Sequence, residues 1–512
     1  MQSKGNSISY KESKVTAFKN KTDYSVIRVL RNVALWLDER LHIAHLFRET
    51  AGHPVPKSSA SWFYVFGSAT LLCLAVQIVS GVCLALVYIP SGSEAYSTLR
   101  YLTLYQELGW FLRGMHCWGS NFMVTIMALH MTQVFLWGAY KYPREMTWIS
   151  GCALLVLILG LAFTGQILRF DEDAYWGLGI GASILARVPF VGDQLVHLVL
   201  GGAIISADTL SRFFALHVFV LPGLALAIIG LHLYLVVLKG ISEYPKPGIQ
   251  VRRDTYDAEY RILLAREGIP FVPKAIGKDL IAAAIVLFGI VGCAAIFGPK
   301  GPMGPPVPTQ IDSVPRPDAP FMWVFALAAL LPDYMEDAVI LGAPLLFGVL
   351  LLSLPFLSNE GEKNWKRRPV AVLAVVLIYL SVGLLTYLGY TAPWSPDMNA
   401  WTAAPIPQKF LEGRTSLELA GAAILQFKQC RNCHALGGIG GCRGPDLADV
   451  GTRLTAQQLT RQILQGGGNM PAYGKNLSPY EIRALVDYMV TLRPEHIPAT
   501  RGSISHEDSK RF

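Results

Sequence analysis

Charged residues are scarce in this sequence. Only 16% of its 512 residues are Asp, Glu, Lys or Arg, whereas 52% are hydrophobic, and the mean hydropathy is +0.38. This balance argues against an ordinary soluble protein and indicates a chain that crosses a membrane several times, in contact with lipid. The net charge of +8 does not indicate a nucleic-acid partner, because the basic residues cluster in loops between apolar runs.

Cysteines are also few, and their placement argues against a disulfide framework. Five of the eight lie in apolar surroundings, where we expect reduced core residues: Cys73, Cys83, Cys117, Cys152 and Cys293. The polar, basic residues 1–60 lack the early apolar segment of a signal peptide, so we expect no cleaved leader.

Seven apolar runs are long enough to cross a bilayer. They cover residues 62–88, 115–138, 148–168, 213–239, 278–298, 339–357 and 369–390. The shorter run at 321–331 is interpreted as a re-entrant or interfacial helix, residues 184–205 as short surface helices, and the amphipathic stretch 25–47 as an interfacial helix. The expected fold class is therefore all-α, a polytopic helical bundle of about seven spans with a small all-α domain at its C-terminal end.

Basic residues mark one side of the expected bundle. They are concentrated before the first run, between the fourth and fifth runs, and between the sixth and seventh. The positive-inside rule then predicts a cytoplasmic N-terminus. Seven crossings would deliver the C-terminal domain to the outer side of the membrane.

Two of the apolar runs carry paired histidines. His116 and His130 are 14 residues apart, and His217 and His232 are 15 apart. Each spacing returns a side chain to nearly the same helix face about 21–23 Å further along. Two such helices packed antiparallel would present one imidazole pair near each end of the bundle, an arrangement that holds haem. The alternative is four unrelated polar residues satisfied by neighbours, although imidazole within a bilayer is usually functional.

Glycines repeat this spacing in two other runs. Gly67 and Gly81 are 14 residues apart, and so are Gly151 and Gly165. Glycine lets a flat macrocycle or another backbone approach a helix closely. Ordinary helix packing would explain either pair alone, but the match to the histidine spacing favours clearance for haem.

A covalent haem motif follows the Pro- and Ala-rich stretch 391–415. In Cys430-Arg431-Asn432-Cys433-His434, a C-x-x-C-H motif, the two cysteines form thioethers and His434 ligates iron. Met470 is the expected sixth ligand, since Met/His ligation is the arrangement of c-type haem. A zinc site is disfavoured, because no second cysteine pair follows.

These features together resemble a known family. Residues 34–240 resemble the four-helix cytochrome b of Rieske/cytochrome b complexes, closest to the chloroplast-type and bacterial split branch. Residues 270–390 resemble the three-helix companion subunit of that branch, subunit IV, and 416–495 resemble a monohaem cytochrome c. The matching cytochrome b segments are Trp36-Leu-Asp-Glu-Arg-Leu41, Leu112-Arg113-Gly114-Met115-His116, Tyr142-Pro-Arg-Glu-Met-Thr-Trp148 and Thr209-Leu-Ser-Arg-Phe-Phe-Ala-Leu-His217.

The resemblance divides the chain into seven parts. Residues 1–60 would be a cytoplasmic segment with an amphipathic helix, 61–240 the dihaem cytochrome b domain and 241–277 a cytoplasmic loop. The subunit IV-like domain would cover 278–390 and the linker 391–415. The cytochrome c domain would cover 416–495, and a polar tail 496–512.

The resemblance also implies two non-covalent b haems and one covalent c haem. It pairs His116 with His217 at a haem near the outer face, and His130 with His232 at a haem near the cytoplasmic face. Arg113 and Arg212 are then implied as propionate or haem-edge partners.

Two quinone sites are implied as well. Lys278-Asp279 resembles the family's Lys-Asp pair at the inner site, where a carboxylate can relay protons, and Lys239 is a further candidate there. At the outer site, Pro317-Asp318-Ala319-Pro320 stands where the family has Pro-Glu-Trp-Tyr. Asp318 thus replaces the glutamate that takes a proton from quinol, and both aromatic positions are lost.

Two further segments depart from the family's pattern. Arg169-Phe170-Asp171-Glu172 replaces a turn that contains Pro-Trp, just before Trp176-Gly177, and Gly177 is implied at the outer quinone site. Val65 stands where the split branch often has a cysteine that tethers an additional haem. A covalently tethered extra haem is therefore not expected.

The function implied is that of a quinol:cytochrome c oxidoreductase component, which acts only within a complex. Quinol would give one electron to a Rieske iron–sulfur protein and one to the outer b haem, and the c domain would pass electrons to other cytochromes c. We expect a homodimeric complex in a bacterial-type energy-transducing membrane, supplied by the quinone pool.

Two other functions stay open. The altered outer site is compatible with a non-bifurcating conduit between the quinone pool and extracytoplasmic cytochromes, including one that works toward quinone reduction. A haem-based sensor or assembly protein is disfavoured, because the expected haems form a continuous path for electrons across the membrane.

Overall fold

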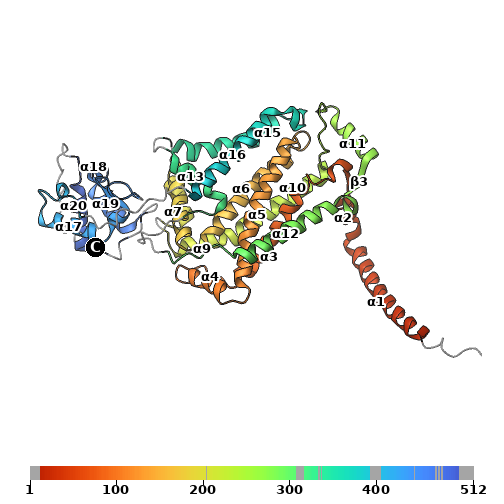
Figure 1. Ribbon diagram of the computed structural model, residues 1–512, viewed down its shortest axis with the longest axis horizontal. Coiled ribbons are helices and arrows are strands. Elements are labelled where there is room, and N and C mark those ends of the chain that lie inside the picture. The colour runs from red at the N-terminus through yellow and green to blue at the C-terminus, as the bar shows by residue number, and fades with distance from the viewer. Residues whose placement is uncertain are drawn as a thin grey trace, which may run out of the picture.

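The computed structural model describes residues 12–202, 205–306, 316–331, 335, 337–391, 405–442, 444–466, 470, 473 and 477–494 (Figure 1). The rest of the chain, which includes most of the expected linker and the polar tail, lies outside these residues. The described chain is mostly helical, as expected. It adds three ribbons of two very short strands each.

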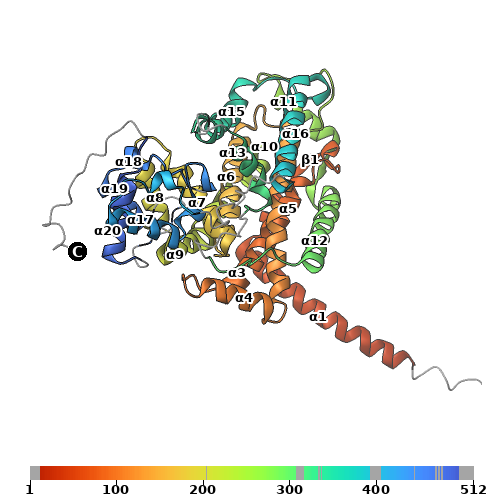
Figure 2. The same cartoon turned by 60° about the vertical axis from the view of Figure 1, so that its left-hand side comes forward.

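Long helices lie side by side in the central bundle (Figures 1 and 2). Six described helices are long and apolar enough to cross a membrane, which confirms a multi-pass membrane protein. They comprise α3 (Phe66–Ala85), α6 (Glu145–Ile167), the segment Asp208–Lys239, α12 (Gly277–Phe297), the segment Ala338–Leu357 and α16 (Pro369–Thr391). Buried side chains of α3, α5, α6 and α12 form one apolar cluster at the centre of the bundle.

The expected span at 115–138 falls in α5 (Gly109–Leu136), a helix that is long enough to cross but is not among those six. Arg113, Asn121 and Gln133 are among the polar residues that lower its hydropathy. Arg113 and Gln133 are buried, and α5 packs against α3 and α12 (Figure 2). Such side chains face protein rather than lipid, so a hydropathy window undervalues a central helix of this kind.

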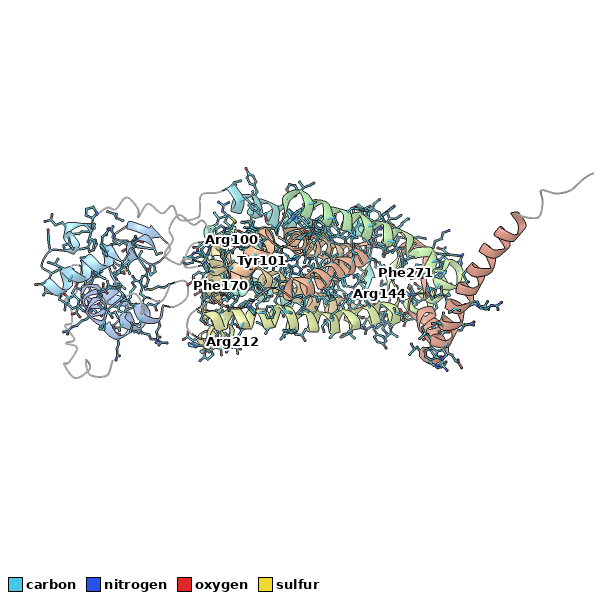
Figure 3. All side chains as sticks on the ribbon, turned by 90° about the horizontal axis from the view of Figure 1, so that it is seen from below. Arg100, Tyr101, Arg144, Phe170, Arg212 and Phe271 are labelled. Carbon is cyan, nitrogen blue, oxygen red and sulfur yellow. The ribbon has the colours of Figure 1, made fainter. Side chains whose placement is uncertain are left out.

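The two ends of the bundle are marked in Figure 3 by Arg144 and Phe271 at one end and by Phe170 and Arg212 at the other. We call them the Arg144 end and the Arg212 end. At the first, β1 (Pro54–Pro56) pairs with β3 (Gly268–Pro270), so the chain enters the bundle there. It leaves at the second, where Tyr390 near the end of α16 accepts a hydrogen bond from Arg316 Nη1. Entry and exit at opposite ends require an odd number of crossings, so α5 crosses as well.

The expectation that the two histidine helices pack antiparallel is wrong. A single crossing, α6, separates α5 from the helix that carries His217 and His232, so the two run in the same direction. His116 and His217 accordingly meet, with ring centroids 6.2 Å apart. The first histidine of one helix therefore faces the first histidine of the other.

The helix of His217 changes its winding at that residue. It consists of α9 (Ala207–Ala215), the π-helical turn η2 (Leu216–Val220) and α10 (Leu221–Lys239). Pro222 has no N–H, so it cannot donate to the carbonyl four residues earlier. The N–H of the preceding residue, Leu221, donates to the carbonyl of Leu216, five residues earlier. Such π-turns often occur at functional sites, and this one holds a predicted iron ligand.

A polar cluster at the Arg144 end joins the two halves of the chain. Lys363 Nζ donates to Glu243 Oε1 at 2.6 Å and to Ser242 Oγ at 2.7 Å, and Arg144 Nη1 donates to the Tyr256 hydroxyl. Burial would raise the pKa of Glu243, but the charge and hydrogen bond of Lys363, together with the charge of Arg144, outweigh it and hold that pKa below its usual range. The loop after α10 and the loop before α16 are thus fastened together.

Short elements surround the bundle. The run at 321–331 forms η4 (Ala319–Phe321) and α13 (Met322–Leu330), too short to span, as expected. The surface-helix region holds α7 (Glu172–Ala186) and α8 (Gly192–Leu200), and α7 begins earlier than expected. In place of one helix at 25–47 there are two, α1 (Glu12–Leu41) and α2 (Ile43–Thr50), and α1 projects from the bundle in Figure 1.

The C-terminal domain has its own core. Helix α17 (Ser416–Phe427) packs on α20 (Pro479–Val490), with α18 (Val450–Arg453) and α19 (Ala456–Gln465) beside them. A Cβ at Gly421 would stand 2.0 Å from the carbonyl oxygen of Ala484, so the two helices meet backbone to backbone. This core also contains Ile406, which lies before residue 416, where the domain was expected to begin.

Candidate functional site

Each of the four predicted glycines lies against one of the four predicted histidines. At the Arg212 end, a Cβ on Gly81 would stand 3.1 Å from the His116 ring, and one on Gly165 would stand 2.7 Å from the His217 ring. At the other level, the corresponding distances are 3.4 Å from Gly67 to His130 and 3.6 Å from Gly151 to His232. The sequence-predicted residues thus gather in two groups, one at each level of the bundle.

Three of the histidines are held by a hydroxyl from the residue just before the glycine. His116 Nδ1 lies 2.9 Å from Ser80 Oγ, His217 Nδ1 lies 3.0 Å from Thr164 Oγ1, and His232 Nδ1 lies 2.9 Å from Ser150 Oγ. Each hydroxyl also bonds a carbonyl of its own helix: Val76 for Ser80, Gly160 for Thr164 and Thr147 for Ser150.

These paired contacts fix the tautomer of three rings. A hydroxyl has one proton, and the carbonyl takes it because a carbonyl can only accept. The hydroxyl oxygen must then accept from Nδ1–H, which leaves the lone pair of the imidazole on Nε2. An imidazole oriented in this way is ready to bind a metal through Nε2. The three hydroxyls were missed from the sequence, although a Ser or Thr before each of these glycines was a visible signal.

The residues present fit two haems. The donor set is four imidazoles in two groups. The rings of His116 and His217 have centroids 6.2 Å apart, and His130 and His232 lie at the other level, against Gly67 and Gly151. The glycines leave room beside every ring, and His130 Nδ1 is buried without a hydrogen-bond partner among the described residues. Two facing imidazoles are a usual axial ligand set for iron in haem.

The two arginines implied as haem partners differ in setting. Arg113 is buried, and its guanidinium donates to the carbonyl oxygens of Lys300 at 2.9 Å and Gly301 at 3.0 Å. Arg212 is exposed, and its Nη1 donates to the carbonyl oxygen of Leu198 at 2.9 Å. Arg113 therefore holds the loop after α12 against α5, while Arg212 joins α9 to α8.

Asp318 lies in a cluster of charges at the Arg212 end. Its Oδ1 is 3.1 Å from Arg169 Nη1 and 2.9 Å from Lys300 Nζ. Arg169 also faces Asp171 and Asp173, and Lys300 lies 3.3 Å from Asp173. Burial would lower the pKa of Arg169, but the three carboxylates, Asp318 foremost, raise it above its ordinary value. Lys300 was not identified from the sequence.

The other residues implied at the outer quinone site meet here too. The backbone N–H of Asp318 donates to Gln166 Oε1 at 3.2 Å, and a Cβ on Gly177 would stand 3.2 Å from Gln166 Nε2. The carbonyl of Pro317 faces Lys300 Nζ at 3.5 Å. Helix capping would be an ordinary role for an aspartate at this position, but the Asp318 side chain makes no capping bond to η4.

Lys278 and Asp279, the pair implied at the inner quinone site, lie at the other level of the bundle. Asp279 Oδ1 accepts a hydrogen bond of 2.5 Å from Ser68 Oγ, the residue after Gly67, and Lys278 Nζ donates to the carbonyl of Ala60 at 3.0 Å. Asp279 is therefore next to the helix turn that contacts His130. Lys239 is exposed at the end of α10, and no contact of the described residues brings it to Asp279.

In the C-terminal domain, the C-x-x-C-H histidine is also held through Nδ1, here by a backbone carbonyl. His434 Nδ1 lies 2.8 Å from the carbonyl oxygen of Pro445, so Nδ1 carries the proton and Nε2 is free for iron. A Cβ on Gly444 would stand 2.3 Å from this ring. Cys430 and Met470 pack against one apolar core, Met470 beside Gln462 Nε2. Cys433 lies in the same turn as Cys430.

The loop behind His434 is itself anchored. The Asp446 carboxylate accepts from the backbone N–H groups of Gly437, Gly438 and Ala448. Burial would raise the pKa of Asp446, but these amides outweigh it and hold the pKa below its usual range. The carboxylate therefore stays charged and fixes the Pro445 carbonyl on the histidine.

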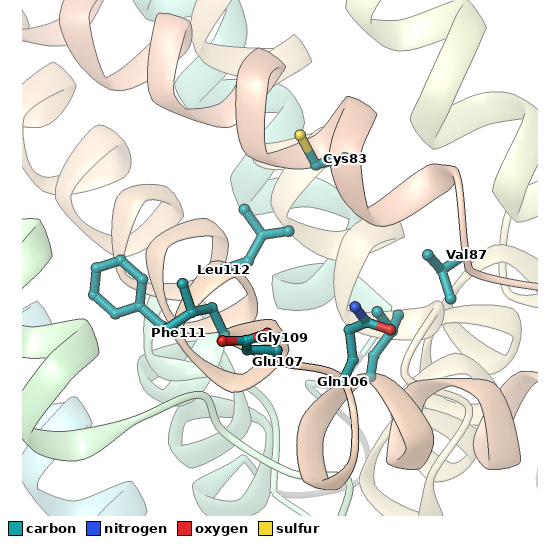
Figure 4. Close-up of a pocket in the computed structure, with 9 residues that line it drawn as sticks. Cys83, Val87, Gln106, Glu107, Gly109, Phe111 and Leu112 are labelled. Atoms are coloured by element: carbon teal, nitrogen blue, oxygen red, sulfur yellow. The ribbon is translucent and has the colours of Figure 1, made fainter.

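A pocket of about 320 Å³ opens between α3, α4 (Ala95–Leu104) and α5 (Figure 4). Cys83, Phe111 and Leu112 give it a largely apolar wall, and Gln106 lies at its edge. None of the residues predicted for a haem or quinone lines it.

These observations define a class of protein, a membrane helical bundle with two levels of paired imidazoles that is joined to a small domain with a covalent haem motif. The family described as "Cytochrome b/b6/petB" matches residues 51–240, and the family "Cytochrome C oxidase, cbb3-type, subunit III" matches residues 418–489.

The chain is also similar to individual proteins of this class. The chain is 30% identical over 365 residues to the cytochrome bc complex cytochrome b subunit of Chlorobaculum thiosulfatiphilum, covering 70% of this chain and 81% of that protein. It is 38% identical over 214 residues to the menaquinol:cytochrome c reductase cytochrome b subunit of Geobacillus thermodenitrificans, covering 40% of this chain and 96% of that protein. A solved structure described as "Hyperthermophilic respiratory Complex III" is similar at a TM-score of 0.58 and 29% identity, covering 70% of this chain and 91% of that one.

The chain therefore belongs to the cytochrome b/b6 family of bc complexes. It extends beyond the length of a cytochrome b6 and carries a C-terminal cytochrome c domain. It is homologous to the cytochrome b subunits of quinol:cytochrome c reductases, as the resemblance implied. Membership in this family implies b haems, and the C-terminal match implies a c haem.

Proposed function

We propose that this chain oxidises quinol within a bc-type complex and carries electrons through two b haems and one c haem. The observation that carries the proposal is the contact of four glycines with four histidines, in two groups at two levels. Each group contains two imidazoles, and the absent side chain of each glycine lets a ring or a flat macrocycle approach the helix closely. Haem supplies one-electron chemistry there, and the protein supplies ligands, clearance and orientation.

In this proposal His116 and His217 hold the outer haem, and His130 and His232 hold the inner one. In the C-terminal domain, Cys430 and Cys433 attach the third haem, and His434 and Met470 ligate it. Arg212 is exposed and can reach a propionate. Arg113 acts through the loop at Lys300 and Gly301, to which it is already bonded.

At the outer quinone site, Asp318 accepts the proton of the quinol hydroxyl. Both cations, Arg169 and Lys300, contact its Oδ1. The other carboxylate oxygen, Oδ2, is then the one that receives the proton. Asp173 lies on the far side of Lys300 and offers the proton a second carboxylate. Pro317 and Gly177 shape the site around Gln166, which holds the Asp318 backbone.

At the inner quinone site, Asp279 delivers protons to quinone. Ser68 donates to one of its oxygens and so orients the carboxylate beside the level of His130. Lys278 is fixed to the Ala60 carbonyl and keeps a cation next to the site. Lys239 makes no contact with Asp279 among the described residues, so it could act on this site only through the longer-range effect of its charge.

The surroundings of the chain follow from this function. The relatives are subunits of bc complexes and the similar solved structure is a respiratory complex III, so we place a Rieske iron–sulfur protein and further cytochromes c next to this chain, in a homodimeric complex. The N-terminus is cytoplasmic, and the cytochrome c domain lies on the outer side of an energy-transducing membrane. The exit of the chain at the Arg212 end, where the outer haem is proposed, supports this placement.

A second function is favoured by one observation. The family's two aromatic residues are absent at the outer site, and the remaining acid is held by two cations. An acid held in this way favours a non-bifurcating conduit that exchanges electrons between the quinone pool and outer cytochromes.

Purification of the native complex distinguishes the two functions. The primary proposal expects an iron–sulfur subunit to co-purify with this chain, and quinol to reduce cytochrome c only when that subunit is present. A fully active complex that contains no iron–sulfur protein would establish the conduit instead.

A further inference from the structure

One of the four bundle histidines lacks the contact that orients the other three. Ser80, Thr164 and Ser150 each place an oxygen 2.9 to 3.0 Å from a histidine Nδ1. His130 Nδ1 is buried and has no hydrogen-bond partner among the described residues. The two levels are therefore unequal, because the outer level has two hydroxyl contacts and the inner level has one.

The cause is a single residue. The position before the glycine is serine or threonine at Gly81, Gly151 and Gly165, but it is Phe66 at Gly67. Gly67 contacts His130 just as the other glycines contact their own histidines. Phe66 instead packs against the apolar cluster at the centre of the bundle. A phenylalanine ring offers no lone pair to an N–H group, so the Nδ1 proton of His130 is left without an acceptor.

A hydrogen bond at Nδ1 changes what the imidazole does at Nε2. When Nδ1–H donates, the ring gains electron density and becomes a more basic ligand. A more basic ligand stabilises ferric over ferrous iron, so it lowers the reduction potential. Two such ligands act at the outer level and one at the inner level, and the difference makes the inner level the easier one to reduce.

We propose that Phe66 sets the order of the two b-haem potentials, because it withholds from His130 the hydrogen bond that the other three histidines receive. Phe66 is a positioning residue, since it acts only through His130. The proposal rests on the proposed function, because it takes His130 and His232 as ligands of the inner haem. Its consequence is directional: electrons run downhill from the level near Asp318 to the level near Asp279.

The test is a potentiometric titration of the b-haem absorbance in the purified full complex. The wild type should show two b transitions. Phe66→Ser supplies a hydroxyl and should move the higher-potential transition downward while the lower one stays in place. Phe66→Leu, which removes the ring and supplies no oxygen, is the matched control and should shift neither transition in this way. A Phe66→Ser complex with both midpoints unchanged, or with only the lower one moved, overturns the proposal.

If Phe66→Ser does not assemble, the removal of a hydroxyl from an outer-level histidine tests the same proposal. Ser80→Ala removes the hydroxyl from His116 Nδ1 with little change in side-chain volume and should move the lower-potential transition upward, toward the other. No movement would overturn the proposal. A chain that binds fewer than two b haems in the wild type would instead refute the proposed function, so the two failures are distinguishable.

Discussion

Arg169 and Asp318 form an ion pair, with Arg169 Nη1 3.1 Å from Asp318 Oδ1. The pair joins the two segments that were seen to depart from the family's pattern, at the proposed outer quinone site. One is the turn before α7, where Asp171 also caps the helix by accepting from the Ala174 N–H. The other is the Pro317–Pro320 stretch before α13. In this chain a charged pair therefore links the two segments.

Asp318→Asn tests whether this acid takes the quinol proton. Asparagine keeps the size and polarity of the side chain but cannot act as a base. A positioned carboxylate contributes about 10²–10⁴-fold to proton transfer, so quinol-dependent cytochrome c reduction should slow by at least roughly tenfold, with all haem spectra intact. Asp254→Asn, an exposed carboxylate paired with Arg252, is the control and should leave the rate unchanged. A wild-type rate in the Asp318 variant would mean that the proton leaves by another route.

Gly165→Val tests the clearance beside the outer histidine. A Cβ at this position already stands 2.7 Å from the His217 ring, so valine should displace the ring and exclude the outer haem. The ratio of b to c haem in the purified complex should fall to about half of the wild-type value. Gly230→Val lies in the same bundle, and a Cβ there meets nothing within 4 Å, so this control should keep the full ratio. Retention of both b haems by Gly165→Val would refute the role of this glycine.

Met470→Ala tests the sixth ligand of the c haem. The proposed thioethers through Cys430 and Cys433 do not depend on Met470, so haem should stay attached after denaturation of the variant. Its spectrum should change to that of a high-spin or misligated c haem, because alanine offers no donor to the iron. Met489 packs in the same domain core, and Met489→Leu is the control that should keep the native spectrum. An unchanged spectrum in Met470→Ala would exclude this methionine as a ligand.

Protease accessibility tests the orientation. An odd number of crossings and the proposed cytoplasmic N-terminus would put the 391–415 stretch outside the cytoplasm. Protease added to spheroplasts should therefore release the cytochrome c domain, and the same protease added to inverted vesicles should not. Cleavage in inverted vesicles alone would reverse the proposed topology.

The sequence was sufficient to predict the two levels of the bundle. The spacings of 14 and 15 residues match a fixed distance along any helix, so two levels could be expected before the fold was known. The pairing of His116 with His217 came from the resemblance, because antiparallel packing would have brought His116 to His232. The relative direction of the two histidine helices was predicted wrongly, because periodicity does not show which way a helix runs. Counting the single crossing between His130 and His217 would have shown that the two helices run in the same direction.

Other features were not accessible in the same way. Gln166 reaches Asp318 across 152 residues and Lys300 across 18, and no local pattern marks such contacts. The short ribbons, such as Pro54–Pro56 with Gly268–Pro270, pair too few residues to produce an alternating pattern. The serine or threonine before three of the glycines, by contrast, was visible in the sequence, and its importance appears only when the histidine Nδ1 atoms are in place.

The haem content of the purified chain tests the central claim most directly. Pyridine haemochrome analysis should give two b haems for each c haem, because two imidazole pairs and one C-x-x-C-H motif are present and Val65 offers no thiol for another covalent haem. The two b haems should remain extractable by acid acetone, and the c haem should not. Equal amounts of b and c haem in the wild-type chain would contradict the account.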